Sequence, residues 1–320
     1  MAVHSQEKAS SALSQSSKQN IRKKKGSLKD QQVQPAARAR YKAAVALLVA
    51  YWNMFSAGPS RFKTWDEATA EYIEHIYAEG ESLALAADTL AGLQYMHTRA
   101  LGHLKESWRL VGIWRRSEPP CRVLPFLPIM ALGLAGSAFS AGLIDVCALI
   151  LVGFNVFLRT SEMLDLRICC ITFSSNRASL KLCSTKTGKR KGIDEHVTVT
   201  SSLAVQMLKL AVRKRPKSER VCQRTPYAFR KVFKHLMGIF HLQVGEYNVY
   251  SLRRGGATAY FTQCGSLDKT LITGRWEHAS TARIYIEEAT AQASEMKLTD
   301  TQLSLLRLAA SKLKELDSTA

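Results

Sequence analysis

The sequence of 320 residues is long enough for about two folded domains, and its 46% hydrophobic content excludes a wholly disordered chain. It contains 45 Lys and Arg against 26 Asp and Glu, a formal net charge of +19. A surplus of this size favours a polyanionic partner, nucleic acid before a membrane surface, because basic side chains neutralise phosphates and release counterions. A basic surface without a specific ligand is the alternative.

The seven cysteines occur singly or as the adjacent pair Cys169 and Cys170, mostly inside apolar runs. They show neither the C-x-x-C spacing of a zinc site nor the pattern of a disulfide framework. The first 34 residues are rich in Ser, Gln and Lys and lack the apolar core of a secretory signal. These features predict an intracellular protein without a metal or cofactor.

Residues 1–38 are polar and predict a disordered basic tail, because they contain too few apolar residues to form a core. The cluster Arg22-Lys-Lys-Lys25 is typical of a nuclear localisation signal, of an arm that touches DNA, or of a solvated tail. The three interpretations stay open, and the first predicts a nuclear location.

Apolar residues recur at helical spacing from residue 39 to residue 116 and predict a small all-helical domain. Thr64 and Glu67 have the spacing of a capping box, and Ser82 precedes a helix whose apolar residues, Met96 included, are expected to face inward. Some basic residues of this domain are candidates for phosphate contacts, although a solvated face also explains them: Lys63, Arg99, Lys105, Arg109, Arg115 and Arg116.

Two adjacent prolines predict a linker over residues 117–122, because they remove backbone donors and favour extended backbone. A second domain is expected over residues 123–295, followed by a C-terminal helix over residues 296–320. That helix is amphipathic, and its apolar face is expected to pack on its own domain or to dock into a neighbouring copy. The face consists of Leu303, Leu306, Ala310, Leu313 and Leu316.

The second domain opens with two apolar runs, residues 123–144 and 146–158, the first of which is long enough for a membrane-spanning helix. Prolines and glycines interrupt the first run, Asp145 separates the two, and Arg159 follows the second. The sequence therefore favours two buried helices.

Three short segments rich in β-branched residues predict an antiparallel sheet: residues 164–173, 178–184 and 195–200. The turn between the second and third strands carries Lys186, and its Lys189, Arg190 and Lys191 are candidate DNA contacts. Five helices are then expected, over residues 202–214, 226–242, 251–264, 267–273 and 280–289. The predicted fold class is mainly α with a small antiparallel β-sheet, a helical domain followed by an α+β domain.

Arg253 and Arg254 stand at the start of a helix, where the positive end of the helix dipole disfavours cations. An anion bound at that terminus would resolve the conflict. Arg159 follows a buried apolar helix, and Glu162, three residues on, is placed to pair with it. Taken singly, the Arg159–Glu162 pair also fits a structural ion pair, and Tyr285 fits a packing tyrosine.

These residues occur in a fixed order: Arg159-x-x-Glu162, Lys186 in a turn, Ser251-Leu-Arg253, Gly274-Arg-Trp276 and Ile284-Tyr285. The order and spacing resemble the catalytic domain of tyrosine recombinases, also called the phage integrase family. The variant Ser-Leu-Arg-Arg-Gly-Gly-Ala-Thr is most similar to recombinases of DIRS-like retroelements and related eukaryotic mobile elements. The resemblance covers residues 41–289 and implies a helical core-binding domain, which contacts DNA, followed by the catalytic domain.

The resemblance assigns Tyr285 as the nucleophile that forms a 3′-phosphotyrosyl link to DNA. It implies that Arg159 and Arg253 bind the non-bridging phosphate oxygens and that Trp276 donates its indole N–H to one of them. Lys186 would protonate the 5′-oxygen leaving group, with Lys189 and Lys191 as alternatives. Rejoining then needs neither ATP nor a metal, because the covalent ester preserves the energy of the broken bond.

One position departs from the family pattern. Tyr250 stands where the family usually has His or Lys, and a phenol with a pKa of about 10 is a poor proton shuttle at neutral pH. The departure predicts either weakened activity or transfer of the proton-shuttle role to His278. His278 also fits an ordinary surface histidine without a catalytic role. Supporting roles fall to Glu162, which would hold Arg159, and to Arg254.

The leading hypothesis is a site-specific DNA recombinase or integrase of a mobile element that clasps double-stranded DNA between two basic domains. A catalytically inactive DNA-binding derivative, favoured by Tyr250, and a type IB topoisomerase-like enzyme are the alternatives. Recombinases of this family act as tetramers that pass a C-terminal helix between protomers, so the resemblance also implies a homo-tetramer on DNA. No membrane partner is expected.

Overall fold

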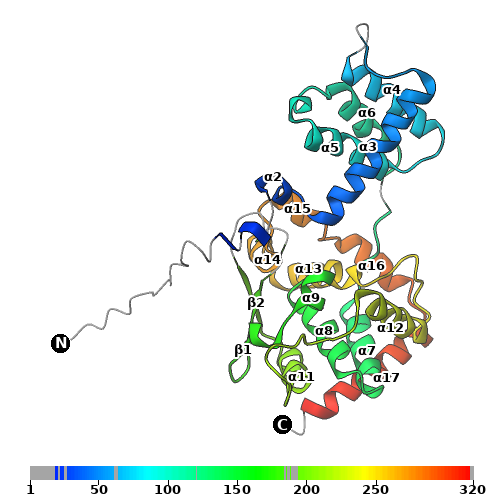
Figure 1. The fold of residues 1–320 in the computed structure, drawn as a ribbon. Coiled ribbons are helices and arrows are strands. Elements are labelled where there is room, and N and C mark those ends of the chain that lie inside the picture. The colour runs from blue at the N-terminus through cyan, green and yellow to red at the C-terminus, as the bar shows by residue number, and fades with distance from the viewer. Residues whose placement is uncertain are drawn as a thin grey trace. The chain divides into compact units, whose positions relative to one another are not determined.

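The structure, a computed structural model, describes residues 19–20, 22–24, 27–60, 64–119, 121–183, 185, 188 and 194–317. The chain divides into two compact units, residues 1–121 and residues 122–320 (Figure 1). Both are mainly helical, and the second also contains a three-stranded antiparallel sheet. The predicted fold class is thereby confirmed.

The first unit is a set of helices around one apolar core. Its elements are α2 (Leu28–Gln31), α3 (Pro35–Phe55), α4 (Trp65–Ala78), α5 (Leu83–Met96), a 3₁₀ turn (Thr98–Ala100) and α6 (Lys105–Ser117). The long helix α3 packs mainly on α5, and α4 packs on α6. The core includes Leu48, Trp52, Tyr72, Leu90 and Trp114.

Local sequence signals set the starts of these helices. The Thr64 hydroxyl accepts a hydrogen bond from the Glu67 N–H at 3.2 Å, and the Glu67 carboxylate accepts one from the Thr64 N–H at 2.8 Å, which confirms the predicted capping box. Helix α3 begins at Pro35, within the segment predicted as a tail, because proline favours the first helical turn. Met96 was expected to face inward but is 37% exposed, since it occupies the end of α5.

The second unit begins with α7 (Pro128–Ser140), α8 (Ile144–Asn155), α9 (Thr160–Asp165) and a 3₁₀ turn (Ile168–Cys170). The strands β1 (Ile171–Phe173), β2 (Ala178–Leu182) and β3 (Glu195–Val199) follow. The remaining elements are α11 (Ser202–Val212), α12 (Pro226–Ile239), α13 (Tyr250–Cys264), α14 (Leu267–Gly274), α15 (Ala279–Arg283), α16 (Glu288–Met296) and α17 (Asp300–Asp317).

Helix α8 forms the centre of this unit, and every residue from Val146 to Val152 is buried. Helices α7, α11 and α13 pack around it. The two apolar runs are therefore buried helices, as predicted. Among the helices in the described residues, none has the length and apolar character needed to cross a membrane.

The sheet is antiparallel in the order β1-β2-β3, with Ile171 opposite Leu180 and Leu180 opposite Val197. The prediction of a strand over residues 164–173 is wrong for most of its length, because only Ile171–Phe173 joins the sheet and Ile168–Cys170 form a 3₁₀ turn. The first two residues of the predicted strand belong to α9, which begins where the Glu162 carboxylate accepts a hydrogen bond from the Arg159 N–H.

The predicted helix over residues 280–289 is also wrong, because α15 ends at Arg283 and α16 begins at Glu288. The Tyr285 N–H donates to the Ala282 carbonyl at 2.8 Å, a bond three residues back that tightens and ends the helix. Tyr285 thus lies in a turn between two helices.

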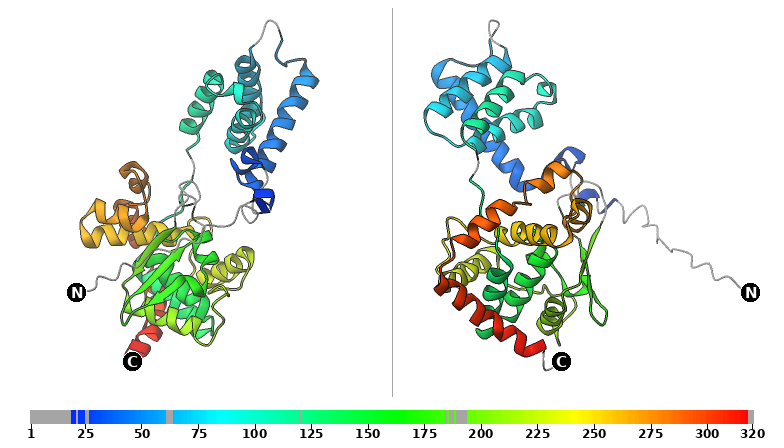
Figure 2. Two further views of the ribbon diagram at one scale, coloured as in Figure 1. Left: turned by 60° about the vertical axis from the view of Figure 1, so that its left-hand side comes forward. Right: turned by 180° about the vertical axis from the view of Figure 1, so that it is seen from behind.

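The C-terminal helix α17 packs on α7 of its own chain, and Figures 1 and 2 show the two helices side by side. Leu306 and Leu313 are fully buried, so the described part of the predicted apolar face is covered within the chain, whereas the Leu316 side chain lies outside the described residues. Gly133 and Gly136 permit this close approach, because a Cβ at Gly133 would overlap the Leu306 side chain and one at Gly136 would overlap the Ala309 carbonyl.

Gly136→Ala is expected to destabilise the protein by about 1–3 kcal/mol, because the added methyl group forces α17 away from α7. Gly238→Ala in α12 is the matched control: its Cβ meets nothing within 4 Å, and the better helix propensity is expected to stabilise by about 0.5–1 kcal/mol. Urea unfolding of the two variants measures both effects. Equal stability changes of the same sign would contradict the proposed packing.

Candidate active site

Helix α13 places two arginines in the middle of the second unit. A Cβ at Gly255 would overlap the Phe126 backbone, and one at Gly256 would overlap the Phe154 carbonyl, so the helix approaches both segments closely. Arg253 and Arg254, directly before these glycines, are 0% and 2% exposed. The sequence Arg-Arg-Gly-Gly is thus a close helix contact that buries two cations.

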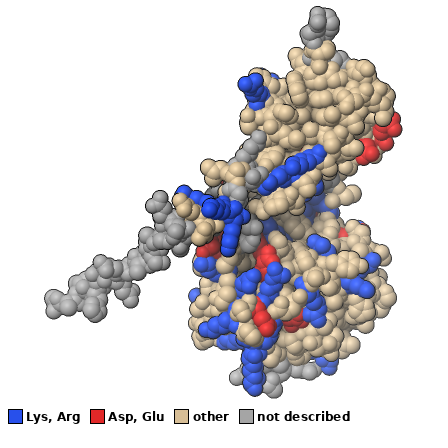
Figure 3. Space-filling model, viewed as in Figure 1, with Lys and Arg blue, Asp and Glu red and all other residues tan. Residues whose placement is uncertain are grey.

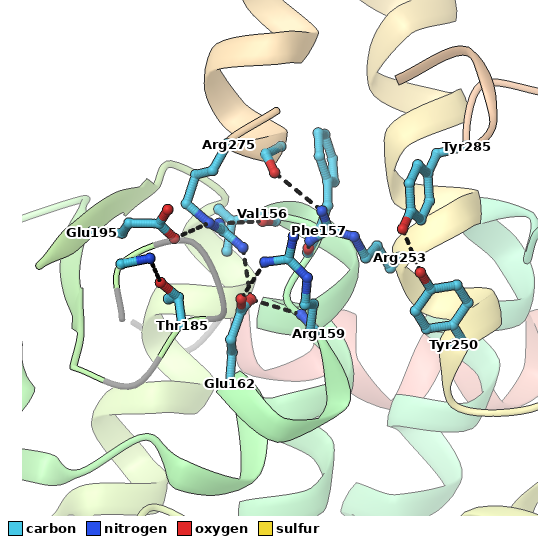
Figure 4. Close-up of polar contacts among 12 residues, drawn as sticks. Val156, Phe157, Arg159, Glu162, Thr185, Glu195, Tyr250, Arg253, Arg275 and Tyr285 are labelled. Carbon is cyan, nitrogen blue, oxygen red and sulfur yellow. Dashed lines mark hydrogen bonds and ion pairs between the residues drawn. The ribbon is translucent and has the colours of Figure 1, made fainter. Parts of the chain in front are cut away.

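The Arg253 guanidinium is held by backbone carbonyls. Its Nη1 donates to the Phe157 oxygen, and its Nη2 donates to the Gly274 oxygen at 3.1 Å (Figure 4). Its Nε is buried without a hydrogen-bond partner among the described residues. Burial and the nearby charges of Arg159 and Arg275 lower the pKa of Arg253 to about 10. The site therefore holds positive charge that the protein only partly compensates.

Glu162 joins two other arginines. Its Oε1 accepts from Arg159 Nη1 at 2.6 Å, and its Oε2 accepts from Arg275 Nη2 at 2.7 Å. Burial alone would raise the pKa of Glu162, but Arg275 and Arg159 hold it below its usual value, so the carboxylate is ionised. The Arg159 side chain stays 25% exposed, which leaves part of its guanidinium open to an anion.

Arg275 and Glu195 also belong to this site, although the sequence did not point to them. Arg275 ends α14 with a left-handed φ of 57°, and its side chain, 7% exposed, lies between Glu162 and Glu195 (Figure 4). Its Nε is 3.3 Å from Glu195 Oε2, an ion pair without hydrogen-bond geometry. Its position directly before Trp276 was the one signal in the sequence.

Trp276 and Tyr285 stack in a small apolar cluster beside α13. The Trp276 ring lies 4.8 Å from the Tyr285 ring at 25° and 6.2 Å from the Phe157 ring at 16°. The Arg253 Cζ atom is 4.8 Å from the Trp276 centroid and 5.1 Å from the Tyr285 centroid. The Trp276 indole Nε1 is buried and has no hydrogen-bond partner within the described ranges.

Tyr250 contacts Tyr285 directly through a hydrogen bond between the two hydroxyls, and their rings are 5.9 Å apart at 51° (Figure 4). Burial, together with the hydrogen bond and the electrostatic interaction with Tyr285, raises the pKa of Tyr250 to about 12. Tyr250 is therefore a neutral phenol at physiological pH.

Further contacts from α13 hold the segment that carries Tyr285. The Thr258 hydroxyl lies 3.0 Å from the Tyr285 carbonyl oxygen and accepts from the Glu287 N–H at 3.2 Å. Arg254 Nη2 forms an ion pair with Glu287 Oε1, although without hydrogen-bond geometry. One turn further on, the Thr262 hydroxyl donates to Glu288 at 2.8 Å. One face of α13 thus fixes Tyr285 next to Arg253.

The structure brings together Arg159, Glu162, Tyr250, Arg253, Trp276 and Tyr285, with Arg254 beside them. His278 is exposed at the start of α15, and among the described residues no hydrogen bond, ion pair or ring contact joins it to this cluster. Arg99 and Lys105 are exposed in the first unit. Some predicted residues lie outside the described residues: Lys63, Lys186, Lys189, Arg190 and Lys191.

A basic surface on α12 was also missed. Phe229 and Phe233 bury one face of this helix, whereas Arg230, Lys231 and Lys234 are exposed on the other. A search for amphipathic helices with a basic polar face would have found it. Figure 3 shows Lys and Arg spread over the visible face of the second unit, with few acidic side chains. Such a surface suits a polyanion.

The described residues contain no group of three or more His, Cys, Asp or Glu side chains that could hold a metal ion. The groups that do converge are guanidinium N–H donors, an indole N–H donor and a phenol. Donors of this kind can bind an anion, and a phenol oxygen can act as a nucleophile.

No protein-family model matches the sequence, and no curated protein is similar to it. Solved structures do match. The XerH site-specific recombinase, in a post-cleavage complex with palindromic difH substrate, is 13% identical over 79% of this chain and 79% of its own, with a TM-score of 0.56. Lambda integrase, a dimer bound to a COC′ core site, is 12% identical over 80% of this chain and 90% of its own, with a TM-score of 0.55.

The Tn1549 transposon integrase in complex with transposon right end DNA is 10% identical, with a TM-score of 0.55 over 83% of this chain and 94% of its own. Similarity at these identities concerns the fold. The chain therefore has the fold of the tyrosine recombinases.

Proposed function

We propose that the protein is a site-specific DNA recombinase or integrase that breaks and rejoins duplex DNA through a covalent 3′-phosphotyrosine intermediate at Tyr285. The fold, shared with recombinases and integrases that were solved on DNA, supports this function. The net charge of +19 and the exposed basic face of α12 support a polyanionic substrate.

One observation carries the proposal: unsatisfied donors converge beside a phenol. Arg253 Nε and Trp276 Nε1 are both buried without a hydrogen-bond partner among the described residues, which is unfavourable unless an acceptor binds there. The non-bridging oxygens of a phosphodiester are such acceptors, and their negative charge would compensate the positive charge of Arg253. Tyr285 lies against both donors, where its oxygen could attack the phosphorus.

In the proposed step the Tyr285 oxygen attacks the phosphorus and the bond to the 5′-oxygen breaks. The phenol proton passes to water, and the leaving 5′-oxygen takes a proton from Lys186, a role that rests on the family resemblance. Attack by a 5′-hydroxyl of another strand reverses the step and frees Tyr285. Arg159 and Arg253 stabilise the charge that develops on the non-bridging oxygens.

Incubation with nicked duplexes made from the DNA that flanks the native gene tests the proposal. We expect a protein–DNA adduct that survives denaturation, forms without ATP and in the presence of a metal chelator, and maps to Tyr285 by peptide mass spectrometry. An adduct on another residue, or stable binding to these duplexes without any adduct, would contradict it.

A catalytically inactive DNA-binding derivative is the second candidate, and the bond between Tyr250 and Tyr285 favours it because the usual His or Lys is missing. Absence of adduct with both the unmodified protein and Tyr250→His would support this candidate. Adduct formation by the unmodified protein would exclude it. Relaxation of supercoiled plasmid by a monomer, without recombinant products, would instead indicate a type IB topoisomerase-like enzyme.

We further infer a homo-tetramer on double-stranded DNA, a nuclear location and an origin in a DIRS-like or related mobile element. The tetramer was expected to form through the C-terminal helix. The apolar face of α17 is occupied by α7 of the same chain, so exchange between copies would require α17 to leave this site. Deleting α17 would uncover α7, and truncation therefore cannot test assembly separately from folding.

A further inference from the structure

We propose that Tyr250 is a positioning residue for the nucleophile: its hydroxyl holds the Tyr285 hydroxyl beside the arginine cluster and stabilises the oxygen that attacks the phosphorus. This inference rests on the proposed function of Tyr285. It gives Tyr250 a role as a hydrogen-bond donor to the nucleophile, whereas its place in the sequence suggested a poor substitute for a proton shuttle.

The first turn of α13 builds the contact. The Tyr250 N–H donates to Asn248 Oδ1 at 2.8 Å, and the Asn248 N–H donates to the Ser251 hydroxyl at 3.1 Å, which fixes the start of the helix. Tyr250 and Arg253 are three residues apart and lie on the same helix face. That face meets Tyr285 at two points, the hydroxyl through Tyr250 and the ring through Arg253.

Protonation decides the direction of the hydrogen bond. With both phenols neutral, either hydroxyl can donate. The raised pKa of Tyr250 keeps its proton in place at neutral pH, so once Tyr285 gives up its proton only Tyr250 can donate. A hydrogen bond to an anionic oxygen is stronger than one to a neutral oxygen. Tyr250 therefore favours the reactive form of Tyr285.

The phosphate does not need Tyr250. The described part of the site contains buried guanidinium and indole donors without a hydrogen-bond partner, Arg253 Nε and Trp276 Nε1 among them, whereas the Tyr250 hydroxyl already has a partner in Tyr285. Other contacts hold the segment that carries Tyr285. Thr258 contacts the Tyr285 backbone carbonyl, and Arg254 pairs with the neighbouring Glu287. Tyr250 adds a contact to the Tyr285 hydroxyl oxygen, the atom proposed to attack the phosphorus.

The first test is the rate of adduct formation by Tyr250→Phe on a nicked duplex. Loss of a hydrogen bond to a charged oxygen is expected to slow it by about 10- to 100-fold while DNA binding is unchanged. Tyr260→Phe is the matched control, since Tyr260 lies on the same helix, packs on Phe157 and is expected to react at the unmodified rate. An unchanged or faster rate for Tyr250→Phe overturns the proposal.

The second test separates the nucleophile from the leaving group. In a duplex with sulfur in place of the bridging 5′-oxygen, the leaving group needs no proton, because a thiol has a pKa of about 8.5. Lys186→Ala is expected to recover on this substrate, whereas the defect of Tyr250→Phe is expected to remain. Recovery of Tyr250→Phe would place Tyr250 at the leaving group and overturn the proposal.

The third test needs neither DNA nor activity. In protein labelled with fluorotyrosine, the ¹⁹F signal of Tyr285 is identified by its loss in Tyr285→Phe. We expect Tyr250→Phe to shift this signal and Tyr260→Phe to leave it in place. An unmoved Tyr285 signal in Tyr250→Phe would show that the contact between the two hydroxyls is absent. A shifted signal, combined with no adduct from the unmodified protein, would confirm the contact but count against the proposed function.

Discussion

Tyr285→Phe is expected to abolish the covalent protein–DNA adduct and to leave duplex binding unchanged. The substitution removes one oxygen, the proposed nucleophile, and the remaining ring still stacks on Trp276. The arginines and the basic face of α12 are untouched, so phosphate contacts persist. We expect a fall of at least about 10³-fold in adduct yield, measured on denaturing gels, at an unchanged Kd from filter binding.

Tyr260→Phe serves as its control as well, because it removes a phenol oxygen from the same small cluster. Adduct formation by Tyr285→Phe at more than a trace level would show that another residue is the nucleophile. A parallel loss of binding would show that Tyr285 holds the site together and would leave its chemistry unsupported.

Arg253→Lys is expected to show the second largest effect. Lysine keeps the charge, but its single ammonium cannot reach the Phe157 and Gly274 oxygens and also offer a donor to phosphate. Adduct formation should fall by about 10²- to 10³-fold, as for loss of a transition-state donor elsewhere. Arg307→Lys, at an exposed position of α17, is the control. Equal rates for the two variants would contradict the role of Arg253.

Sulfate provides an independent measurement at the same residue. The pKa of Arg253 in the folded protein, about 10, lies below its usual value, so its charge opposes folding at neutral pH, and this opposition is lost only as the pH rises from 10 towards the usual pKa of arginine. An anion that binds the folded protein is therefore expected to raise the Tm, and Arg253→Lys should reduce the increase.

The sequence predicts this site wherever local spacing controls the outcome. Arg159 and Glu162, three residues apart, were expected to pair and do so at 2.6 Å. The Glu162 carboxylate also caps the Arg159 N–H and starts α9, which takes the first two residues of the expected first strand, and residue propensities alone do not show this. The local spacing was sufficient to predict the ion pair between Arg159 and Glu162, but it did not predict that Glu162 would start a helix.

The remaining site depends on distant contacts. The left-handed φ of Arg275, which places its side chain between Glu162 and Glu195, has no marker in the sequence because arginine rarely adopts that conformation. The hydrogen bond between Tyr250 and Tyr285 joins residues that are separated in the sequence by α14 and α15. It depends on the turn that ends α15 at Arg283. Periodicity predicted a continuous helix there, which would have moved Tyr285.

The contact between α7 and α17 affects how the chain folds during its synthesis. Helix α7 is translated well before α17, so the face of α7 that carries Gly133 and Gly136 stays open to water until α17 has been translated. The second unit therefore completes its core late, and its exposed apolar surface favours aggregation in the interval. A nascent chain stalled before residue 300 is accordingly a substrate for chaperones.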